Sequence, residues 1–319
     1  MTLTIVVPVL NEINYIEGLV KSLLINDGFS KEIFLVDGGS DDGTINLIKN
    51  LELKHENLYY LHNKDKYVSH AFNLAFTQSR GKFIALVGAH SILSKNYFKK
   101  AVFELNSNNC DAIGGIFTQI GKDEYSSIIA KCLSSKFGVG NSQPKLIKSR
   151  RYVKTAAFAV YKREILEDIG GFDEDLIRNQ DDEFHYRLVS KGYKMLLDPK
   201  MESTCFTRKN LKALFIQYFQ YGLYKPLVFK NVPSGKSLSH FIPFLFVVYL
   251  LLLPITIYFN LFIITIFPLI FYNIINFYYS HSNSHNLNGK IYSIFVYYCI
   301  HIAYGLGFIL GLTKKNIYA

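Results

Sequence analysis

Residues 33–44, IFLVDGGSDDGT, join an apolar run to a cluster of aspartates, glycines and a serine. Four consecutive apolar residues that end at this cluster predict a buried parallel strand with Asp37 at its carboxyl end. In an open α/β sheet that end of the strands binds ligands, and Gly38 and Gly39 let the backbone approach a ligand closely. Residues 40–42 offer N-cap oxygens to a following helix. An ordinary strand-to-helix turn is the alternative interpretation.

Strands and helices alternate through the first 90 residues. Strand patterns lie at residues 3–9, 32–36, 58–61 and 82–87, and helical patterns lie at 13–24, 43–51 and 68–79. This alternation predicts an α/β fold, with helices flanking a mostly parallel sheet. Residues 33–44 contain neither G-x-G-x-x-G nor G-x-x-x-x-G-K-[ST], so the stretch indicates neither a dinucleotide-binding fold nor a P-loop.

The positive charge and the apolar residues are both concentrated in the second half of the chain. Residues 1–144 carry 14 basic and 14 acidic side chains, so the net charge of +10 belongs to the rest, which is almost continuously apolar from residue 241. Basic residues beside apolar spans favour the cytoplasmic side of a membrane and attract anionic lipids. Nucleic acid is the rival partner of a basic chain, but no recognition helix, zinc finger or RNP-like pattern occurs, so we expect none.

The cysteines and the first residues indicate a cytoplasmic protein. The four cysteines are far apart in the sequence, with no C-x-x-C pair and no histidine spacing suited to zinc. We therefore expect reduced, structural thiols. Residues 1–9 lack the charged start of a signal peptide and are too short for its core, so the part before residue 241 is expected to stay in the cytoplasm.

The strand at residues 3–9 with its PVLNE loop, followed by residues 33–44, resembles the start of family 2 glycosyltransferases, which have the GT-A fold. In that family the first loop and the aspartate that ends the second strand hold the nucleotide of an activated sugar. The resemblance implies that Pro8, Asn11, Glu12 and Asp37 bind the nucleotide, with Asp37 accepting from the base. A strand end supplies the rigid acceptor that a neutral base edge needs. Gly38 belongs to the same donor site.

Two later loops bear on the diphosphate of the donor. Lys64 and Lys66 follow a strand and could contact a pyrophosphate, although solvated loop charges explain them equally well. At residues 86–91, LVGAHS, the resembling family carries an acidic motif that binds a divalent cation; here Gly88 replaces its first acid and His90 remains. Imidazole suits Mn²⁺ better than Mg²⁺. A direct hydrogen bond from His90 to phosphate and a structural role are the alternatives.

A long segment, residues 137–154, is rich in glycine and cations. Loops of this length inside a domain are usually functional or disordered. We interpret it as a lid or acceptor loop in which Lys148, Arg150 and Arg151 could contact an acceptor pyrophosphate. A solvated run of charges is the alternative.

Residues 170–191 contain the second group of chemically active side chains. A helix is expected to restart at Asp181, and a helix N-terminus would keep Asp181 or Asp182 ionised. The stretch resembles the E-D-x-E motif of the same family, with Gln180 in place of the glutamate; this implies that Asp181 is the base that deprotonates the acceptor hydroxyl. The alternative is that the aspartates only cap a helix. His185 and Arg187 are expected to be partners of local carboxylates.

The C-terminal part is expected to contact a membrane. An amphipathic helix at residues 211–224 suits a membrane interface, and residues 241–260, 261–279 and 291–312 are each long and apolar enough to span a bilayer. Three spans would place Lys314 and Lys315 outside, against the positive-inside rule. A re-entrant hairpin over residues 241–279 would avoid this, and the sequence leaves both topologies open.

We therefore expect a GT-A catalytic region at residues 1–225, followed by a membrane region with two or three transmembrane helices at 226–319. The catalytic region would comprise a nucleotide-binding half (1–95), an acceptor and base half (96–210) and an interfacial helix (211–225). The expected activity is inverting transfer of one sugar from a nucleotide sugar, a UDP-sugar, to a lipid-linked acceptor in bacterial surface polysaccharide synthesis, at the cytoplasmic membrane.

Three alternative functions remain. The missing Q-x-x-R-W motif disfavours a processive polysaccharide synthase, and the missing glycine-rich, basic phosphate loop disfavours nucleotidyl transfer. Because Gly88 removes an acidic ligand, a catalytically silent scaffold is also open, and a divalent cation, Mn²⁺ or Mg²⁺, is an uncertain cofactor.

Overall fold

The computed structural model describes residues 1–25, 28–140, 149–259 and 262–314. The chain forms two compact units. The first, here called the sheet unit, comprises Met1–Thr118 and Pro144–Cys205, and the second, the helical unit, comprises Gln119–Gln143 and Phe206–Ala319. Residues 211–225, which the sequence analysis grouped with the catalytic region, therefore belong to the helical unit.

The sheet unit is built on one nine-stranded mixed sheet, in the order β3-β2-β1-β4-β8-β6-β9-β5, with β7 beside β9. The parallel half is β3 (Leu58–His62), β2 (Lys31–Asp37), β1 (Leu3–Val9) and β4 (Phe83–Leu86). The other strands are β8 (Ala157–Lys162), β6 (Ala112–Ile120), β9 (Met195–Phe206), β5 (Ser91–Leu93) and β7 (Arg151–Tyr152). The α/β class is confirmed, but the parallel alternation holds only for the first half, because β8 runs antiparallel to both β4 and β6.

The register brings the carboxyl ends of the four parallel strands to one edge. Val9 lies opposite Asp37, and Asp37 lies opposite His62. Val6 pairs with Leu86, the last residue of β4. We call the loops that follow these strands, residues 10–15, 38–43, 63–67 and 87–90, the carboxyl edge.

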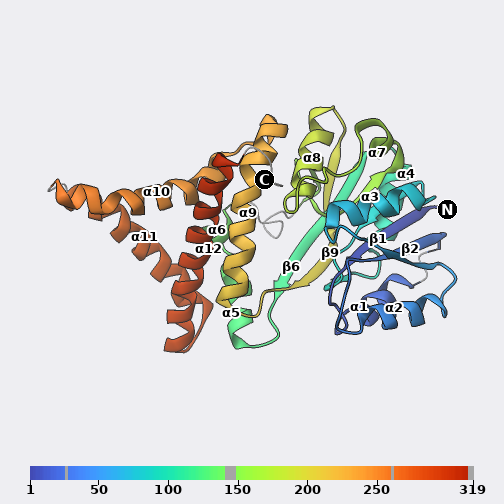
Figure 1. Cartoon of the computed structure of the whole chain (residues 1–319), viewed down its shortest axis with the longest axis horizontal. Coiled ribbons are helices and arrows are strands. Elements are labelled where there is room, and N and C mark those ends of the chain that lie inside the picture. The colour runs from blue at the N-terminus through green and yellow to red at the C-terminus, as the bar shows by residue number, and fades with distance from the viewer. Residues whose placement is uncertain (26–27, 141–148, 260–261, 315–319) are drawn as a thin grey trace. The chain divides into compact units, whose positions relative to one another are not determined.

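Helices cover both faces of this sheet, as Figure 1 shows for α1 and α2 on one face and α3 on the other. One core joins α1 (Ile16–Leu23), α2 (Thr44–Glu52) and α4 (Tyr97–Asn106) to residues of β1 such as Ile5 and Val7. The other joins α3 (Val68–Gln78), α7 (Arg163–Ile169) and α8 (Gln180–Ser190) to Val6 and Val36. Because side chains alternate along a strand, β1 contributes to both cores.

The helical unit contains α5 (Glu124–Leu133), α6 (Lys136–Val139), α9 (Leu211–Asn231), the short η2 (Pro233–Gly235), α10 (Leu238–Tyr258), α11 (Phe262–Asn283) and α12 (Leu287–Thr313). Among the described residues, two helical stretches are long and apolar enough to cross a membrane, Leu238–Thr256 and Leu287–Thr313. The two differ in their surroundings. In the first, 6% of an apolar 18-residue window is buried, and in the second 50% of such a window is buried. Length and composition alone do not distinguish a span from a core helix.

Helix α9 differs from the predicted interfacial helix. It continues to Asn231, seven residues beyond the predicted end, and packs along α12. Gly222 of α9 faces the backbone of Tyr304, and Gly307 and Gly311 of α12 face the backbone of Phe219 and Leu223. The missing side chains allow the two helix backbones to approach closely, as in helix pairs that use small residues at their contact.

We expect Gly307→Ala to lower the free energy of unfolding by about 1–3 kcal/mol, the usual cost of overpacking. The added Cβ would lie 2.1 Å from the carbonyl oxygen of Phe219. Gly18→Ala in α1 is the matched control, because its Cβ would meet nothing within 4 Å and alanine favours a helix by about 1 kcal/mol. Unfolding of both variants in the same detergent checks this, and a Gly307→Ala protein as stable as the parent would contradict the close contact.

Candidate active site at the carboxyl edge

Asp37 holds the turn that follows β2. Its side chain is completely buried, and its carboxylate accepts hydrogen bonds from the backbone N–H of Gly39 at 2.7 Å and of Ser40 at 3.0 Å. The Ser40 hydroxyl donates to the same carboxylate. The predicted contact between Asp37 and a nucleotide base stays a prediction, because these bonds give the carboxylate a structural task at the same position.

The turns after β1 and β2 are fastened to each other. Asn11 has a left-handed backbone, with φ of 57°; its N–H donates to Ser40 Oγ and its side-chain oxygen accepts from the N–H of Asp41. The N–H of Glu12 donates to Thr44 Oγ1. These bonds explain why α1 begins at Ile16, three residues later than the pattern predicted.

Two further details of this region differ from the sequence interpretation. The N-cap of α2 is Gly43, without a side-chain cap, because the Ser40 hydroxyl is bonded to Asp37 instead. Asp42 does accept from the N–H of Thr44, the first residue of that helix. Pro8, predicted to bind the nucleotide, lies within β1 opposite Val36.

The turn after β3 joins the same group of residues. The N–H of Asn63 donates to the carbonyl of Asp37, and Lys66 has a φ of 66° with an exposed side chain. A Cβ on Gly38 would lie 3.1 Å from the carbonyl oxygen of Lys66, so glycine allows these two turns to approach. The structure thus brings together Asp37, Gly38 and Lys66, three of the predicted donor-binding residues.

His90 and Glu12 form a pair that the sequence did not reveal. The distance from His90 Nδ1 to Glu12 Oε1 is 3.1 Å, and their side chains are 38% and 18% exposed. The ring of Tyr15 lies edge-on to His90. Glu12 follows β1 and His90 follows β4, and these strands are neighbours in the sheet. Within the described residues no group of three His, Cys, Asp or Glu side chains could hold a metal ion.

Helix α8 directs Asp181 toward the carboxyl edge. Just beyond its C-terminus, the carbonyl of Lys194 accepts from the N–H groups of Asp111 and Ala112, where β6 begins. Both β6 and β4 run antiparallel to β8, so β6 begins at the edge of the sheet opposite the carboxyl edge. The segment before α8 runs toward the carboxyl edge, because the carbonyl of Leu176 accepts from Ser69 Oγ at 3.5 Å, at the start of α3 just after the turn at residues 63–67. The 11 residues of α8 extend roughly 16 Å, about the length of a strand, which is enough to run between the two edges. Asp181 is exposed, and its Oδ1 accepts from the N–H of Asp182.

The turn before α8 is held from two sides. Asn73 of α3 exchanges two hydrogen bonds of 2.9 Å with the backbone of Phe172. Arg187 of α8 donates to the carbonyls of Ile169 and Gly171 and to both carboxylate oxygens of Glu183. The expectation that Arg187 pairs with a local carboxylate is therefore confirmed.

His185 was expected to have a carboxylate partner and instead lies 2.7 Å from the hydroxyl of Tyr161, measured from its Nε2. Both side chains are buried, and His185 Nδ1 has no hydrogen-bond partner within the described part of the chain. Burial lowers the pKa of His185 to about 4, against a smaller opposing effect of Asp182. The imidazole is therefore neutral at neutral pH, one turn below Asp181.

We expect His185 to make stability depend on pH. Below pH 6.5 the imidazole binds a proton in the unfolded chain, whereas in the folded protein it does so only below about pH 4. The contribution of His185 to the free energy of unfolding is therefore complete above pH 6.5. It is lost as the pH drops toward 4, and the loss is roughly 3 kcal/mol. Unfolding of the parent and of His185→Gln at pH 7.5 and pH 5 checks this; an equal pH dependence in both proteins would contradict it.

Of the predicted acceptor-binding cations, Arg150 is bound by two carboxylates of the sheet unit. Arg150 lies 2.5 Å from Glu104 and 3.8 Å from Asp198, two carboxylates whose side chains are less than a tenth exposed. Arg151 is exposed on β7, opposite Leu197. Lys148 lies outside the described residues. Arg150 therefore neutralises buried acids near the beginning of β9.

The cysteines agree with the expectation of reduced thiols. All four are free. Burial raises the pKa of Cys110 and of Cys205 to about 12, so both are protonated at neutral pH.

Comparisons with known proteins identify the family. The family model described as glycosyl transferase family 2 matches residues 4–170 of the chain. The chain is 27% identical to the succinoglycan biosynthesis protein ExoA of Rhizobium meliloti over 221 residues, which are 68% of this chain and 67% of ExoA. It is 28% identical over 240 residues to a dolichyl N-acetyl-alpha-D-glucosaminyl phosphate 3-beta-D-2,3-diacetamido-2,3-dideoxy-beta-D-glucuronosyltransferase of Methanococcus voltae, 72% of this chain and 74% of that protein.

A solved structure confirms the fold. The mannosyltransferase PcManGT from Pyrobaculum calidifontis, in complex with GDP-Man and Mn²⁺, has a TM-score of 0.61 over 98% of this chain and 88% of its own, at 16% identity. This likeness supports the GT-A architecture. The matched residues 4–170 include every loop of the carboxyl edge and cover more than half of the chain. The protein therefore belongs to glycosyl transferase family 2 and is a glycosyltransferase.

Proposed function

We propose that the protein transfers one sugar, with inversion, from a nucleotide-diphosphate sugar, a UDP-sugar, to a lipid-linked or membrane-proximal glycan acceptor on the cytoplasmic side of the membrane. What supports this proposal is that the segment leading into α8 runs to the edge of the sheet that carries the turns after β1, β2, β3 and β4, so that Asp181 would lie near them. Donor and base are then positioned together, which removes much of the entropic cost of a two-body reaction.

In the proposed reaction Asp181 accepts the proton of the acceptor hydroxyl. The oxygen attacks the anomeric carbon from the side opposite the departing nucleoside diphosphate, which inverts the configuration. Asp181 lies in the first turn of a helix, where the macrodipole stabilises its ionised form and so keeps it able to accept a proton. The neutral His185 adds no positive charge beneath it.

The residues present fit a divalent cation held partly by the donor. Nδ1–H of His90 donates to Glu12 and fixes the ring, so that Nε2 would be the protein ligand, and diphosphate oxygens would supply others. A nitrogen ligand favours Mn²⁺ over Mg²⁺. The cation would neutralise the charge of the leaving diphosphate. The Mn²⁺ bound by PcManGT is consistent with this assignment.

The lipid-linked acceptor is supported by the Methanococcus voltae relative, whose name describes a dolichyl phosphate substrate. The ExoA relative is named for succinoglycan biosynthesis, which supports a role in making surface polysaccharide.

The test is release of nucleoside diphosphate by the purified full-length protein from a panel of UDP-, GDP- and other nucleotide sugars, with Mn²⁺ and with EDTA. We expect release from one donor class, lost in EDTA and strongly reduced in His90→Ala. His55→Ala, remote from the carboxyl edge, is the control. No release from any donor under either condition would instead support the silent scaffold.

A further inference from the structure

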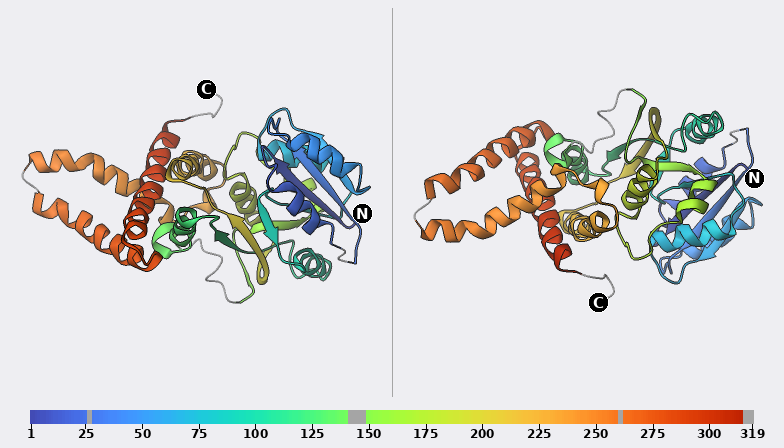
Figure 2. Two further views of the ribbon diagram at one scale, coloured as in Figure 1. Left: turned by 90° about the horizontal axis from the view of Figure 1, so that it is seen from below. Right: turned by 90° about the horizontal axis from the view of Figure 1, so that it is seen from above.

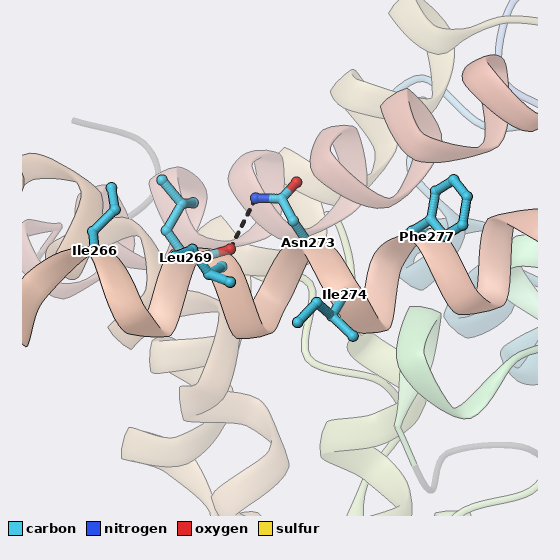
Figure 3. Close-up of a pocket in the computed structure, with 6 residues that line it drawn as sticks. Ile266, Leu269, Asn273, Ile274 and Phe277 are labelled. Atoms are coloured by element: carbon cyan, nitrogen blue, oxygen red, sulfur yellow. Dashed lines mark hydrogen bonds between the residues drawn. The ribbon is translucent and has the colours of Figure 1, made fainter.

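Helices α10 and α11 carry a continuous apolar surface. No Asp, Glu, Lys or Arg occurs between Lys236 and Lys290. The exposed side chains include Leu245, Leu251, Leu252 and Ile255 on α10, and Phe267, Ile270, Phe271, Ile274 and Phe277 on α11. On α11, Asn273 donates to the carbonyl of Leu269 within the helix, as Figure 3 shows, and its side-chain oxygen accepts from the hydroxyl of Tyr298 of α12. Contiguous exposed apolar side chains like those listed for α10 and α11 mark a site of contact with a membrane or another protein.

Helix α12 passes the same test of length and composition but has different neighbours. Its Ser293 lies 3.1 Å from Cys132 of α5, and the hydroxyl of its Tyr297 donates to Ser135. On the other side its glycines contact the backbone of α9. If α12 crossed a bilayer, α9 and α5 would lie at the same depth in it, together with their charged side chains. These are Lys212, Lys225 and Lys230 on α9 and Glu124 and Lys131 on α5. Charged side chains are strongly disfavoured there, so α12 is a core helix.

The two arms of the hairpin formed by α10 and α11 are attached to α12 at separate points. Near the start of α10, Pro243 packs against Gly305, and at the end of α11 Asn283 donates to Ser293 at 2.9 Å. These points are 12 residues, about 18 Å, apart along α12. Between these points the second half of α11 also contacts α12, through Tyr272 with His301 and Asn273 with Tyr298. Figures 1 and 2 show α12 running across the open end of the hairpin.

We propose that only the α10–α11 hairpin enters the lipid bilayer, with both of its ends on one side, and that α12 stays on that side as part of the helical core. Lys230 and Lys236 before the hairpin and Lys290 and Lys314 after it then lie on the same side, as the positive-inside rule requires. The proposal decides between the topologies that the sequence left open. It rests on the proposed membrane association but not on the proposed chemistry, so its test does not use activity.

Topology is tested by introducing single cysteines at exposed positions and labelling them with a membrane-impermeant maleimide. The variants are Ser237→Cys before the hairpin, His285→Cys after it and Lys314→Cys after α12, with Lys95→Cys as the sheet-unit reference and the parent protein as background. We expect all four sites to label in inverted vesicles and none in intact spheroplasts. Labelling of His285→Cys or Lys314→Cys from the side opposite Ser237→Cys would overturn the proposal.

Insertion itself is tested by flotation with vesicles of phosphatidylethanolamine and phosphatidylglycerol. Leu251→Asp, near the middle of α10, is expected to weaken vesicle binding about a hundredfold, since a carboxylate is strongly disfavoured in the hydrocarbon. Leu53→Asp is the matched control, because Leu53 is 86% exposed but lies in the sheet unit. Leu310→Asp, on an exposed part of α12, is expected to have a much smaller effect than Leu251→Asp. Equal losses at Leu251 and Leu310 would show that α12 is inserted as well, and would overturn the proposal.

Discussion

Asp181→Asn is expected to lower the rate of sugar transfer about a hundred- to ten-thousand-fold, the usual contribution of a positioned general base, while donor binding stays unchanged. The amide has nearly the size of the carboxylate and can still accept from the N–H of Asp182, so the first turn of α8 should remain folded. It cannot take up the proton of the acceptor hydroxyl. Single-turnover transfer, together with titration of the donor nucleotide, separates these two effects.

The control for this variant is Asp175→Asn, an exposed aspartate five residues before the same helix. It removes one negative charge from the same region without touching α8, so we expect transfer within a factor of about two of the parent. Near-normal turnover by Asp181→Asn, with donor still bound, would exclude Asp181 as the base. Equal losses in the two variants would point to a general effect of charge.

Arg187→Met is expected to destabilise the protein by about 3–5 kcal/mol, the cost of leaving a buried charge without its partner. Glu183 is only 4% exposed in its side chain and is bonded through both oxygens to Arg187. The same substitution releases the carbonyls of Ile169 and Gly171, so we also expect the turn before α8 to loosen and transfer to fall. Denaturant unfolding and transfer rates measure the two consequences.

Lys21→Met in α1 is the matched control for Arg187→Met. Glu17 and Lys21 form a pair with the same spacing and a similar distance, 2.9 Å, but their side chains are 53% and 72% exposed. Solvent screens that pair, so its loss should leave stability unchanged within error. The double variant Glu183→Leu with Arg187→Met is expected to be more stable than Arg187→Met alone, because no unpaired charge remains. A single variant as stable as the parent would contradict the structural role of the pair.

The parallel half of the fold could be predicted because its strands are short apolar runs, each ending in polar or glycine residues at the binding edge. The position of Asp37 at the end of β2 was found in this way. The pairing of Glu12 with His90 could not, since it depends on β1 lying beside β4, and nothing in the local pattern fixes that order. Arg150 is similar, because the acids that bind it, Glu104 and Asp198, are 46 and 48 residues away in sequence.

The apolar C-terminal part shows a different limit of sequence reasoning. Residues 291–312 have the length and hydropathy of a membrane span, and these do not reveal what surrounds a helix. The glycine contacts with α9 and the polar contacts with α5 are the observations on which the proposal of a core helix at α12 rests. In the proposed topology, the same kinds of apolar side chain contact lipid on α10 and α11 and protein on α12.

The order of synthesis follows from the contact between α9 and α12. The ribosome completes α9 first, then the hairpin, and α12 last. Until α12 has emerged, the face of α9 around Phe219 and Gly222 has no cover, so the nascent helical unit is incomplete while the hairpin is already available to the insertion machinery. A chain that stops before residue 287 would keep that face bare, and we expect proteases to degrade it faster than the whole protein.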